Sequence, residues 1–524
     1  MAGAGFLLGG RNPGCRPSPE DWGQGRLLSS GQALGLAGPV FHEQARLLEP
    51  RSRRGFVHAT SPWPNGSQQA FPLSMLGSPL RCCYGCLRTT EGKHELKKLI
   101  IEGGRPLAGT IRTAGAKNAV LPMMAAGLLS HGTLKLRGAP RLVDVRFMTR
   151  VLRDLGAQAE QAQNGDMEIN ASGDIKGEAS WDLVRRMRGS LCVMGPMLAR
   201  LGRARVSMPG GCVFGVRPID VHLKGFEALG AKIRLESGYI VAETPAGGLR
   251  GASMYLGSAF GSSVLGTANV MMAASLAEGT TVIQGAACEP EIVALADTMN
   301  AMGARVTGHG SPIIEIEGVD ELGDAEIDVI PDRIEAGTYI LLGAMTGGAV
   351  RVTGCRPDHL LVLLNMMKSA ELSFEVGPDW VETKPCDPKD VRPLSTDIST
   401  NVYPGFPTDL QAQWMALMTL GDGISIITER IYHDRWTHIP ELQRLGADIR
   451  RQTTASVVRG VEGLSGAPVT ASDLRASAAL VMAGLVAEGT TEVHRMYHLD
   501  RGYEAMEERL EALGAGVLRD EEDD

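Results

Sequence analysis

The chain has 524 residues, of which 44% are hydrophobic and 21% are charged, and this length is too great for one ordinary domain. Its formal net charge of -8 disfavours a nucleic acid duplex or a membrane surface as the main partner. The longest apolar run, residues 476–487, is shorter than the roughly 18 residues that a membrane-spanning helix needs. We therefore expect a globular protein of two or more domains without a membrane span.

Residues 1–93 differ in composition from the rest of the chain. Gly and Pro interrupt them repeatedly, nine Arg stand against four acidic residues up to residue 90, and no helical or strand period is sustained. We interpret this segment as a disordered extension. The alternatives are an organellar targeting peptide, which would place the protein in the plastid stroma, and a translation start that is set too early.

The nine cysteines form no evenly spaced framework, which favours a reducing compartment over secretion. Cys83 and Cys86 make one CxxC pair without a second pair, so metal or redox use is not expected there. We expect the protein to act in the cytoplasm, and regular structure to begin near residues 94–104.

From there a short pattern that ends a helix and opens a strand recurs six times, at spacings of 67 to 77 residues, starting at residues 128, 199, 276, 344, 419 and 486. A second marker, "LGA" or "MGA", keeps the same period, and a degenerate "AELSFEV" stands in its place at residue 370. Each unit is predicted to contain strand, helix, strand, helix and further short strands. Six units indicate an α/β protein of two domains with three units each.

The stretch "AGAKNAVLPMMAAGLL" (residues 114–129) predicts an amphipathic helix that begins near Lys117 and Asn118. Free backbone N–H groups and the helix dipole favour an anion at such a start, and Lys117 adds a full positive charge. A solvated lysine at a helix start is the simpler alternative.

The stretch "MPGGCVFGVRPIDVH" (residues 208–222) predicts a flexible loop, because glycines and prolines stand on both sides of Cys212. Arg217, Arg435, Arg475 and Arg501 lie at the edges of different units, beside turn residues. Each of them alone is more often a surface charge, but together they favour a polyanionic substrate such as a phosphate or a carboxylate.

Asp409 is predicted at a helix start, where it is either an N-cap or a base that accepts a proton from a hydroxyl group. Two charge clusters, Glu289 with Glu291 and Asp332 with Arg333 and Glu335, are explained by capping and by a domain junction. The histidines lack metal-ligand spacing, and neither a P-loop nor a GxGxxG precedes a helix. We therefore expect neither a metal nor another cofactor.

From about residue 97 to its end the chain resembles the UDP-N-acetylglucosamine 1-carboxyvinyltransferase family, the enolpyruvyl transferases of the first committed step of peptidoglycan synthesis. The resemblance rests on motifs that occur in the family's order: "GAKNA", "MRGS", "PGGCVFGVRPIDVH", "LAEGTT", "EPEIV", "PDRIEAGT", "FPTDLQAQ", "DLRAS" and "YHLDRGYE". The fold that it implies is the inside-out α/β prism of the EPSP synthase-like proteins, with two similar domains of three units each. The implied domains are residues 117–330, which carry the loop 208–222, and a discontinuous domain of residues 94–116 and 331–524.

The resemblance also implies substrates and roles. The substrates are phosphoenolpyruvate and UDP-N-acetylglucosamine, which react by addition and elimination with release of phosphate. Cys212 is implied as the acid that protonates phosphoenolpyruvate and as the residue that the epoxide fosfomycin alkylates, and Asp409 as the base for the sugar 3-hydroxyl. The residues implied to bind phosphoenolpyruvate are Lys117, which also counts as catalytic, Asn118, Arg217, Arg435, Arg475 and Arg501. Those implied to contact the nucleotide sugar are Arg188, Arg217, Pro218, Ile219, Asp220, Val221, Ser263, Val264, Asp409 and Ile431.

Two positions depart from the family pattern and are expected to affect affinity for the nucleotide sugar more than activity. Leu265 stands where the family usually has Gly, and Cys288 where a basic residue is usual. The sister enzyme 5-enolpyruvylshikimate-3-phosphate synthase is disfavoured because this chain has "GAKN" and a loop cysteine. An inactive paralogue with a binding role is disfavoured because Lys117, Cys212 and Asp409 are all present.

Overall fold

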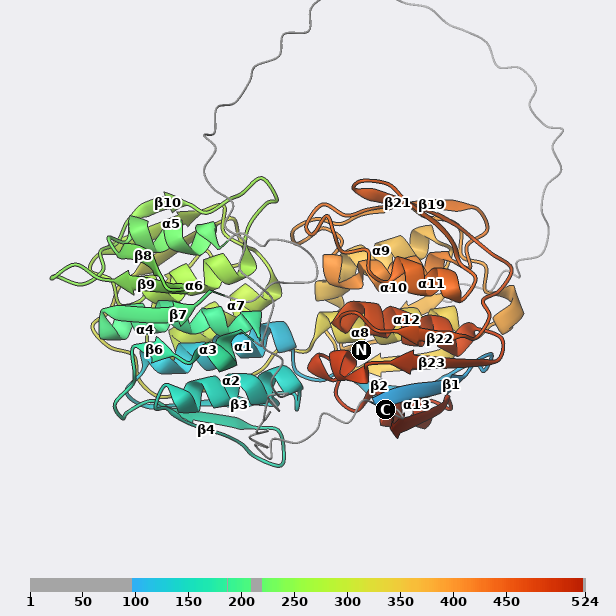
Figure 1. Cartoon of the computed structure of the whole chain (residues 1–524), viewed down its shortest axis with the longest axis horizontal. Helices are drawn as coiled ribbons and strands as arrows, with labels where there is room; N and C mark the ends of the chain where they lie inside the picture. The colour runs from blue at the N-terminus through green and yellow to red at the C-terminus, as the bar shows by residue number, and fades with distance from the viewer. Residues whose placement is uncertain (1–96, 186, 209–218, 522–524) are drawn as a thin grey trace, which may run out of the picture. The chain divides into compact units, whose positions relative to one another are not determined.

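The computed structural model describes residues 97–185, 187–208 and 219–521 (Figure 1). The extension predicted for residues 1–93, with its CxxC pair, lies outside the described residues. The first described strand is β1, Lys97–Glu102, which falls within the stretch expected to open the folded part.

The described residues form six units of α/β structure, as predicted. The sheets that the units build have four strands each and share one pattern, in which an edge strand runs parallel to its neighbour and the remaining pairs are antiparallel. Each unit also contributes two main helices, which we call its first and second helix. The repeated βαβαββ order therefore confirms the fold class that the sequence indicated.

Three of the sheets surround one hydrophobic core, which we call the N core and which is built from residues between Ala116 and Val329. The strands of these sheets, in spatial order, are β14 (Ala325–Asp328), β3 (Thr133–Arg137), β5 (Met167–Asn170) and β4 (Gln158–Gln161); β6 (Glu178–Ala179), β7 (Arg203–Ser207), β9 (Tyr239–Glu243) and β8 (Lys232–Glu236); and β10 (Ser253–Tyr255), β11 (Thr280–Gln284), β13 (Ile313–Glu317) and β12 (Arg305–Thr307). The first helices are α1 (Lys117–Ala126), α4 (Met194–Leu201) and α6 (Val264–Ala274), and the second helices are α2 (Val143–Asp154), α5 (Asp220–Ala228) and α7 (Pro290–Ala301). Shorter helical segments are η1 (Gly127–Leu129), α3 (Trp181–Val184) and η2 (Arg188–Val193).

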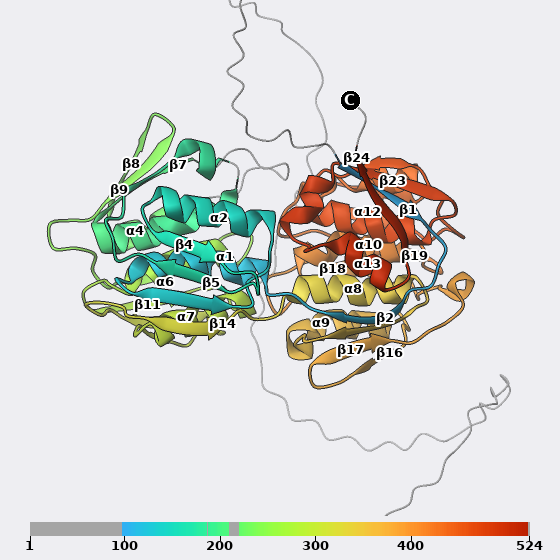
Figure 2. The same cartoon turned by 90° about the horizontal axis from the view of Figure 1, so that it is seen from below.

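The other three sheets surround the C core, which uses residues from Leu99 to Ile111 and from Ile334 to Leu513. Their strands, in spatial order, are β16 (Phe374–Val376), β17 (Trp380–Thr383), β15 (Ala349–Thr353) and β2 (Ala108–Arg112); β18 (Ile398–Ser399), β19 (Ile424–Thr428), β21 (Ala455–Arg459) and β20 (Asp448–Arg451); and β22 (Pro468–Thr470), β23 (Thr490–His494), β1 and β24 (Gly516–Glu521). The first helices are α8 (Arg333–Met345), α10 (Gln411–Met418) and α12 (Leu474–Val486), and the second helices are α9 (Leu361–Ser369), α11 (Ile439–Arg444) and α13 (Met506–Ala512). Shorter 3₁₀ segments are η3 (Pro357–Leu360), η4 (Pro388–Asp390), η5 (Thr408–Leu410) and η6 (Met496–Arg501). In Figure 2, α8, α10 and α12 lie between β1, β23 and β24 on one side and β16 and β17 on the other.

The first helices are buried on nearly every face. All of α8 except Arg333 is buried, and α1 is buried at every position except Asn118. The prediction of an amphipathic helix at Lys117 was therefore wrong. A helix surrounded by sheets has no solvent face and becomes largely apolar all round, so its few charged residues, such as Lys117 of α1 and Arg475 of α12, lie near its ends.

The "LGA" marker is a helix C-cap. At the end of α2, for example, Gly156 has a φ of 104°, and the N–H of Ala157 donates to the carbonyl of Leu152 at 3.0 Å, as in a Schellman motif. In the degenerate fourth copy Glu371 takes the glycine's place with a φ of 57°, at a cost of about 1 kcal/mol, and Leu372 makes the corresponding bond. The cap geometry explains why the marker recurs and why its degenerate copy still works.

The two cores are joined by two segments, residues 113–116 and 329–332, that run between them side by side. The strand β2 leads into α1 but pairs with β15 of the C core, whereas β14 leads into α8 but pairs with β3 of the N core. The two segments bond to each other, because Ala116 donates to the carbonyl of Ile330 at 2.7 Å and Asp332 to that of Ala114 at 2.9 Å. The domain boundaries expected at residues 116/117 and 330/331 stay a prediction.

Candidate active site between the two cores

A cavity of about 540 Å³ is lined by residues of both cores. The starts of α1, α6, α8 and α12 and the segment η5 all reach it, through Asn118, Val264, Arg333, Arg475 and Asp409. Helix starts carry unpaired N–H groups and the positive end of the helix dipole. The cavity is therefore suited to an anionic ligand before any side chain is considered.

Most of the predicted site residues line this cavity. They are Lys117, Asn118, Arg188, Ile219, Val221, Ser263, Val264, Asp409, Ile431, Arg435, Arg475 and Arg501. Asp220 does not line it, because this first residue of α5 is exposed and its carboxylate lies 3.6 Å from the Lys224 ammonium along the helix. Cys212, Arg217 and Pro218 lie outside the described residues.

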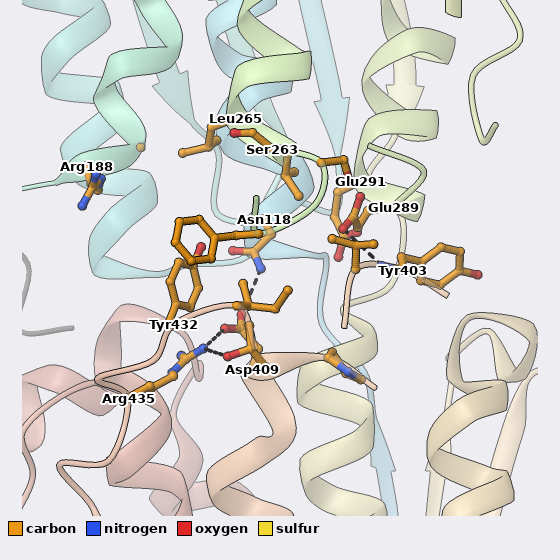
Figure 3. Close-up of a pocket in the computed structure, with 18 of the residues that line it drawn as sticks. Asn118, Arg188, Ser263, Leu265, Glu289, Glu291, Tyr403, Asp409, Tyr432 and Arg435 are labelled. Atoms are coloured by element: carbon orange, nitrogen blue, oxygen red, sulfur yellow. Dashed lines mark hydrogen bonds and ion pairs between the residues drawn. The ribbon is translucent and has the colours of Figure 1, made fainter. Parts of the chain in front are cut away.

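Asp409 binds two arginines of the C core. Arg435 Nη1 lies 2.8 Å from Oδ1, and the amide of Asn118 donates to Oδ2 at 3.3 Å (Figure 3). Arg475 Nη2 lies 3.1 Å from Oδ2. Burial raises the pKa of Asp409, but Arg475 and Arg435 outweigh burial and hold that pKa well below its usual range. The side chain does not cap the helix that it precedes, so the N-cap alternative does not hold, and the cavity contains a fixed carboxylate between two cations.

Hydrogen bonds to neighbouring hydroxyl groups fix the two arginines in place. Arg475 is 2% exposed, and its Nη1 donates to the hydroxyl of Tyr503 at 3.3 Å, while Arg435 Nη1 donates to the hydroxyl of Thr408 at 3.0 Å. A buried guanidinium with fixed partners loses little further freedom when it binds an anion. The simpler interpretation of these arginines as surface charges is thus excluded for Arg435 and Arg475.

A second charge cluster joins the two cores. The Lys117 ammonium lies 2.8 Å from Asp144 Oδ2, and Arg501 Nε, from the C core, lies 2.9 Å from Asp144 Oδ1. Burial lowers the pKa of Lys117, and Asp144 opposes this effect. Burial raises the pKa of Asp144, but Lys117 and Arg501 outweigh it and hold the pKa below its ordinary value. Sequence reasoning missed Asp144, for which an acidic residue in the first turn of a helix was the available signal.

The acidic clusters have two different roles. Asp332 caps α8 by accepting from the N–H groups of Ile334 and Glu335, as expected. Glu291, however, lines the cavity and binds Arg333 at 3.0 Å. Glu289 also lines it, and burial raises its pKa. The expected capping and domain-junction roles therefore left out that Glu289 and Glu291 line the cavity.

Aromatic residues that the sequence analysis did not select complete the wall. The ring of Phe260, from the N core, meets the ring of His433, from the C core, edge to face at a centroid distance of 5.3 Å, and Tyr432 lines the same cavity. Leu265 lines it beside Val264, while the Cys288 thiol donates to the Ala286 carbonyl at 3.7 Å. Isolated aromatic residues in loops gave no periodic signal in the sequence.

Among the described residues, we find no helix with the length and hydropathy needed to cross a membrane. The sequence model of the family "EPSP synthase (3-phosphoshikimate 1-carboxyvinyltransferase)" matches residues 101–510. Two curated UDP-N-acetylglucosamine 1-carboxyvinyltransferases are similar over their whole length, one from Desulforapulum autotrophicum (52% identity over 425 residues) and one from an Anaeromyxobacter species (51% over 427 residues). Each comparison covers 81% of this chain and 100% of the relative.

Solved structures agree in fold. The enolpyruvyl transferase NikO from Streptomyces tendae superposes with a TM-score of 0.74 at 24% identity, over 82% of this chain and 100% of that one. EPSP synthase from Acinetobacter baumannii gives a TM-score of 0.62 at 17% identity, over 81% and 100% of the two chains. The chain belongs to the EPSP synthase family and, within it, to the UDP-N-acetylglucosamine 1-carboxyvinyltransferases.

Proposed function

We propose that this protein transfers the enolpyruvyl group of phosphoenolpyruvate to the 3-hydroxyl of UDP-N-acetylglucosamine and releases phosphate, the first committed step of peptidoglycan synthesis. The observation that carries the proposal is the 52% identity to the UDP-N-acetylglucosamine 1-carboxyvinyltransferase of Desulforapulum autotrophicum over the whole length of that enzyme. A cavity with paired cations at its helix starts supports it. We also propose that the reaction takes place in the cytoplasm.

Phosphoenolpyruvate carries a carboxylate and a phosphate, and the cavity offers matching cations. Arg435 and Arg475 form ion pairs with the carboxylate of Asp409. Lys117 and Arg501 form ion pairs with that of Asp144. Guanidinium groups bind carboxylate and phosphate through paired hydrogen bonds. We assign these four cations to the binding of phosphoenolpyruvate and to neutralising the phosphate that leaves.

Asp409 is our candidate for the base. It is ionised, and because Arg475 and Arg435 stabilise its charged form, it is a weak base as long as both arginines bind it. An anionic substrate that draws the two arginines toward itself weakens this hold and makes Asp409 more basic. The carboxylate then accepts the proton of the sugar hydroxyl while the hydroxyl oxygen bonds to C2 of phosphoenolpyruvate.

The same addition step needs a proton at C3, and we assign that donor to Cys212 from the sequence alone. In the elimination step C3 returns a proton to the thiolate that the addition leaves at Cys212, and the C2–O bond to phosphate breaks, which restores the double bond. The variant Cys212→Ser should lose turnover because a hydroxyl is a much weaker acid than a thiol, while Cys212→Asp should keep turnover and lose sensitivity to fosfomycin. Full turnover in Cys212→Ser would show that another group is the acid.

We propose that the nucleotide sugar binds along the remaining wall of the cavity. Arg188, Ile219, Val221, Ser263, Val264 and Ile431 line it, and we keep Arg217, Pro218 and Asp220 as sequence-based candidates. Leu265 reduces the space beside Val264, so its substitution by Gly should change affinity for the nucleotide sugar more than turnover.

The test is the release of phosphate from phosphoenolpyruvate by the full chain. We expect release only when UDP-N-acetylglucosamine is present, and none when shikimate 3-phosphate replaces it. Release with shikimate 3-phosphate, or equal release without any acceptor, would overturn the proposal.

A further inference from the structure

One buried carboxylate lies between two cations that come from different cores. Asp144, the second residue of α2, has a side chain that is 3% exposed. It binds the ammonium of Lys117 through Oδ2 at 2.8 Å, and its Oδ1 lies 2.9 Å from Nε of Arg501. Arg501 Nη2 also donates to Oδ2 at 3.5 Å, so the carboxylate binds both cations, and both cations line the cavity.

Apart from this carboxylate, the surroundings of Lys117 disfavour its charged form. Lys117 is only 9% exposed, and this burial lowers its pKa. Arg501 from η6 and Arg475 from α12 lower it further. Asp144, from α2, is the neighbour that raises the pKa. Asp332, from the connecting segment, accepts from the backbone N–H of Lys117, and the neutral amide of Asn118 is directed at Asp409.

We propose that Asp144 is a positioning residue for the reaction, which holds the Lys117 ammonium and the Arg501 guanidinium side by side so that a phosphate group can bind to both. The inference rests on the proposed function, because it assigns a substrate phosphate to these two cations. It adds a residue that acts through Lys117 and Arg501 and does not itself touch the substrate.

This role differs in its consequences from a purely structural ion pair. Loss of a purely structural ion pair has an effect that does not grow as the pH rises, because the pair itself disappears once the lysine is neutral. Loss of the carboxylate that keeps Lys117 protonated has an effect that grows as the pH rises, because Lys117 becomes neutral at a lower pH. The effect should fall on phosphoenolpyruvate and spare the nucleotide sugar.

The experiment compares Asp144→Asn, Asp144→Glu and the matched control Asp328→Asn, which removes an exposed aspartate from its ion pair with Arg137. Phosphate release is measured with both substrates between about pH 6 and 10. We expect Asp144→Asn to lower kcat/KM for phosphoenolpyruvate at least tenfold at pH 8, with the basic limb of the profile about one pH unit or more below that of the unmodified enzyme. Asp144→Glu should restore part of the activity and the profile, and Asp328→Asn should match the unmodified enzyme.

A second readout does not depend on activity. The free amine of Lys117 is labelled at graded pH with an amine-reactive reagent, and the peptide that contains it is quantified by mass spectrometry in the folded, unliganded protein. We expect labelling of Lys117 to begin at lower pH in Asp144→Asn than in the unmodified chain. A folded Asp144→Asn variant with unchanged labelling and an unchanged pH profile would overturn the inference.

Two further outcomes remain decisive. If Asp144→Asn does not fold, Arg501→Gln provides the test, because removing this cation should move the labelling of Lys117 to higher pH, and unchanged labelling would contradict the inference. If the unmodified enzyme releases no phosphate, the proposed function fails, and the labelling result still decides whether Asp144 keeps Lys117 charged.

Discussion

The N core and the C core are built from the same unit, yet they supply different chemistry to the cavity between them. The C core contributes the arginines 333, 435, 475 and 501 and the carboxylate of Asp409. Among its described residues, the N core contributes only two cations, Lys117 and Arg188, together with the carboxylates of Asp144, Glu289 and Glu291 and apolar side chains such as those of Val264 and Leu265. The units owe their fold to sheets, buried helices and C-caps, so the residues at the helix starts were free to diverge. A symmetric scaffold can thus carry an asymmetric site.

The largest effect expected from this asymmetry is at Asp409. We expect Asp409→Asn to lower kcat by about 10²- to 10⁴-fold, the usual contribution of a general base, while KM for phosphoenolpyruvate does not rise, because Arg435 and Arg475 lose a competing anion. Steady-state phosphate release checks this split, with Asp358→Asn as the control, since Asp358 is exposed and pairs with Arg356 at 2.7 Å. A kcat within tenfold of that of the unmodified enzyme would show that Asp409 is only a counter-ion of the arginines and not the base.

The next test asks whether the C core needs guanidinium groups or only positive charge. We expect Arg475→Lys to raise KM for phosphoenolpyruvate by about 10- to 100-fold, because an ammonium cannot bond both Asp409 and Tyr503 in the geometry that Arg475 uses. Arg137→Lys, at an exposed ion pair of the N core, is the matched control and should leave the kinetics unchanged. An unchanged KM in Arg475→Lys would mean that charge alone binds the substrate.

A third prediction concerns the segments that join the cores. Glu335 is buried, accepts from the N–H of Ala114 at 2.6 Å and binds Arg509 at 2.9 Å. Burial raises the pKa of Glu335 to about 7, against the opposing effects of Arg509 and the Ala114 N–H. The folded chain therefore binds this proton more tightly than the unfolded chain, so the resulting stability is full at acidic pH and is lost as the pH rises through 7.

Glu335→Gln cannot ionise, so its free energy of unfolding relative to that of the unmodified protein should increase by about 2 kcal/mol between pH 5.5 and pH 8. Urea unfolding of both proteins at the two pH values measures this change. Parallel behaviour of the two proteins would show that Glu335 does not titrate in this range.

The smallest expected effect lies at the aromatic contact between the cores. We expect Phe260→Ala to raise KM for UDP-N-acetylglucosamine by about two- to tenfold with little change in kcat, in keeping with the roughly 0.5–1.5 kcal/mol of an edge-to-face aromatic pair. A double-mutant cycle with His433→Ala checks this prediction, and KM for UDP-N-acetylglucosamine in the double variant should be no higher than in the single variants. Fully additive effects would show that the two rings act independently.

These two regions also show what the sequence could and could not predict. The unit order followed from the spacing of the strand and C-cap markers, because each marker performs a local backbone task that any copy of the unit must repeat. The exchange of β2 and β14 between the cores has no such local signal, since it depends on which sheet each strand joins.

The candidate site likewise contains residues that the sequence predicted and residues that it did not. Lys117 and Asp409 stood out as charges at predicted helix starts, and Arg475 as a charge at the edge of a unit, and the structure brings all three to one cavity. Asp144 and Glu335 looked like ordinary acids of a first helical turn. Their partners, Arg501 and Arg509, are separated from them by 357 and 174 residues, so these pairings could be recognised only from the three-dimensional structure.

The most direct test of the account is the identity of the product. Phosphoenolpyruvate labelled with ¹³C at C2 is incubated with UDP-N-acetylglucosamine and the full chain, and the product is examined by NMR while phosphate is measured in parallel. We predict that the labelled carbon becomes coupled to the proton on C3 of the sugar, that the vinyl methylene is retained, and that one phosphate is released per sugar. Label recovered as free pyruvate, or attached at another hydroxyl, would contradict the account.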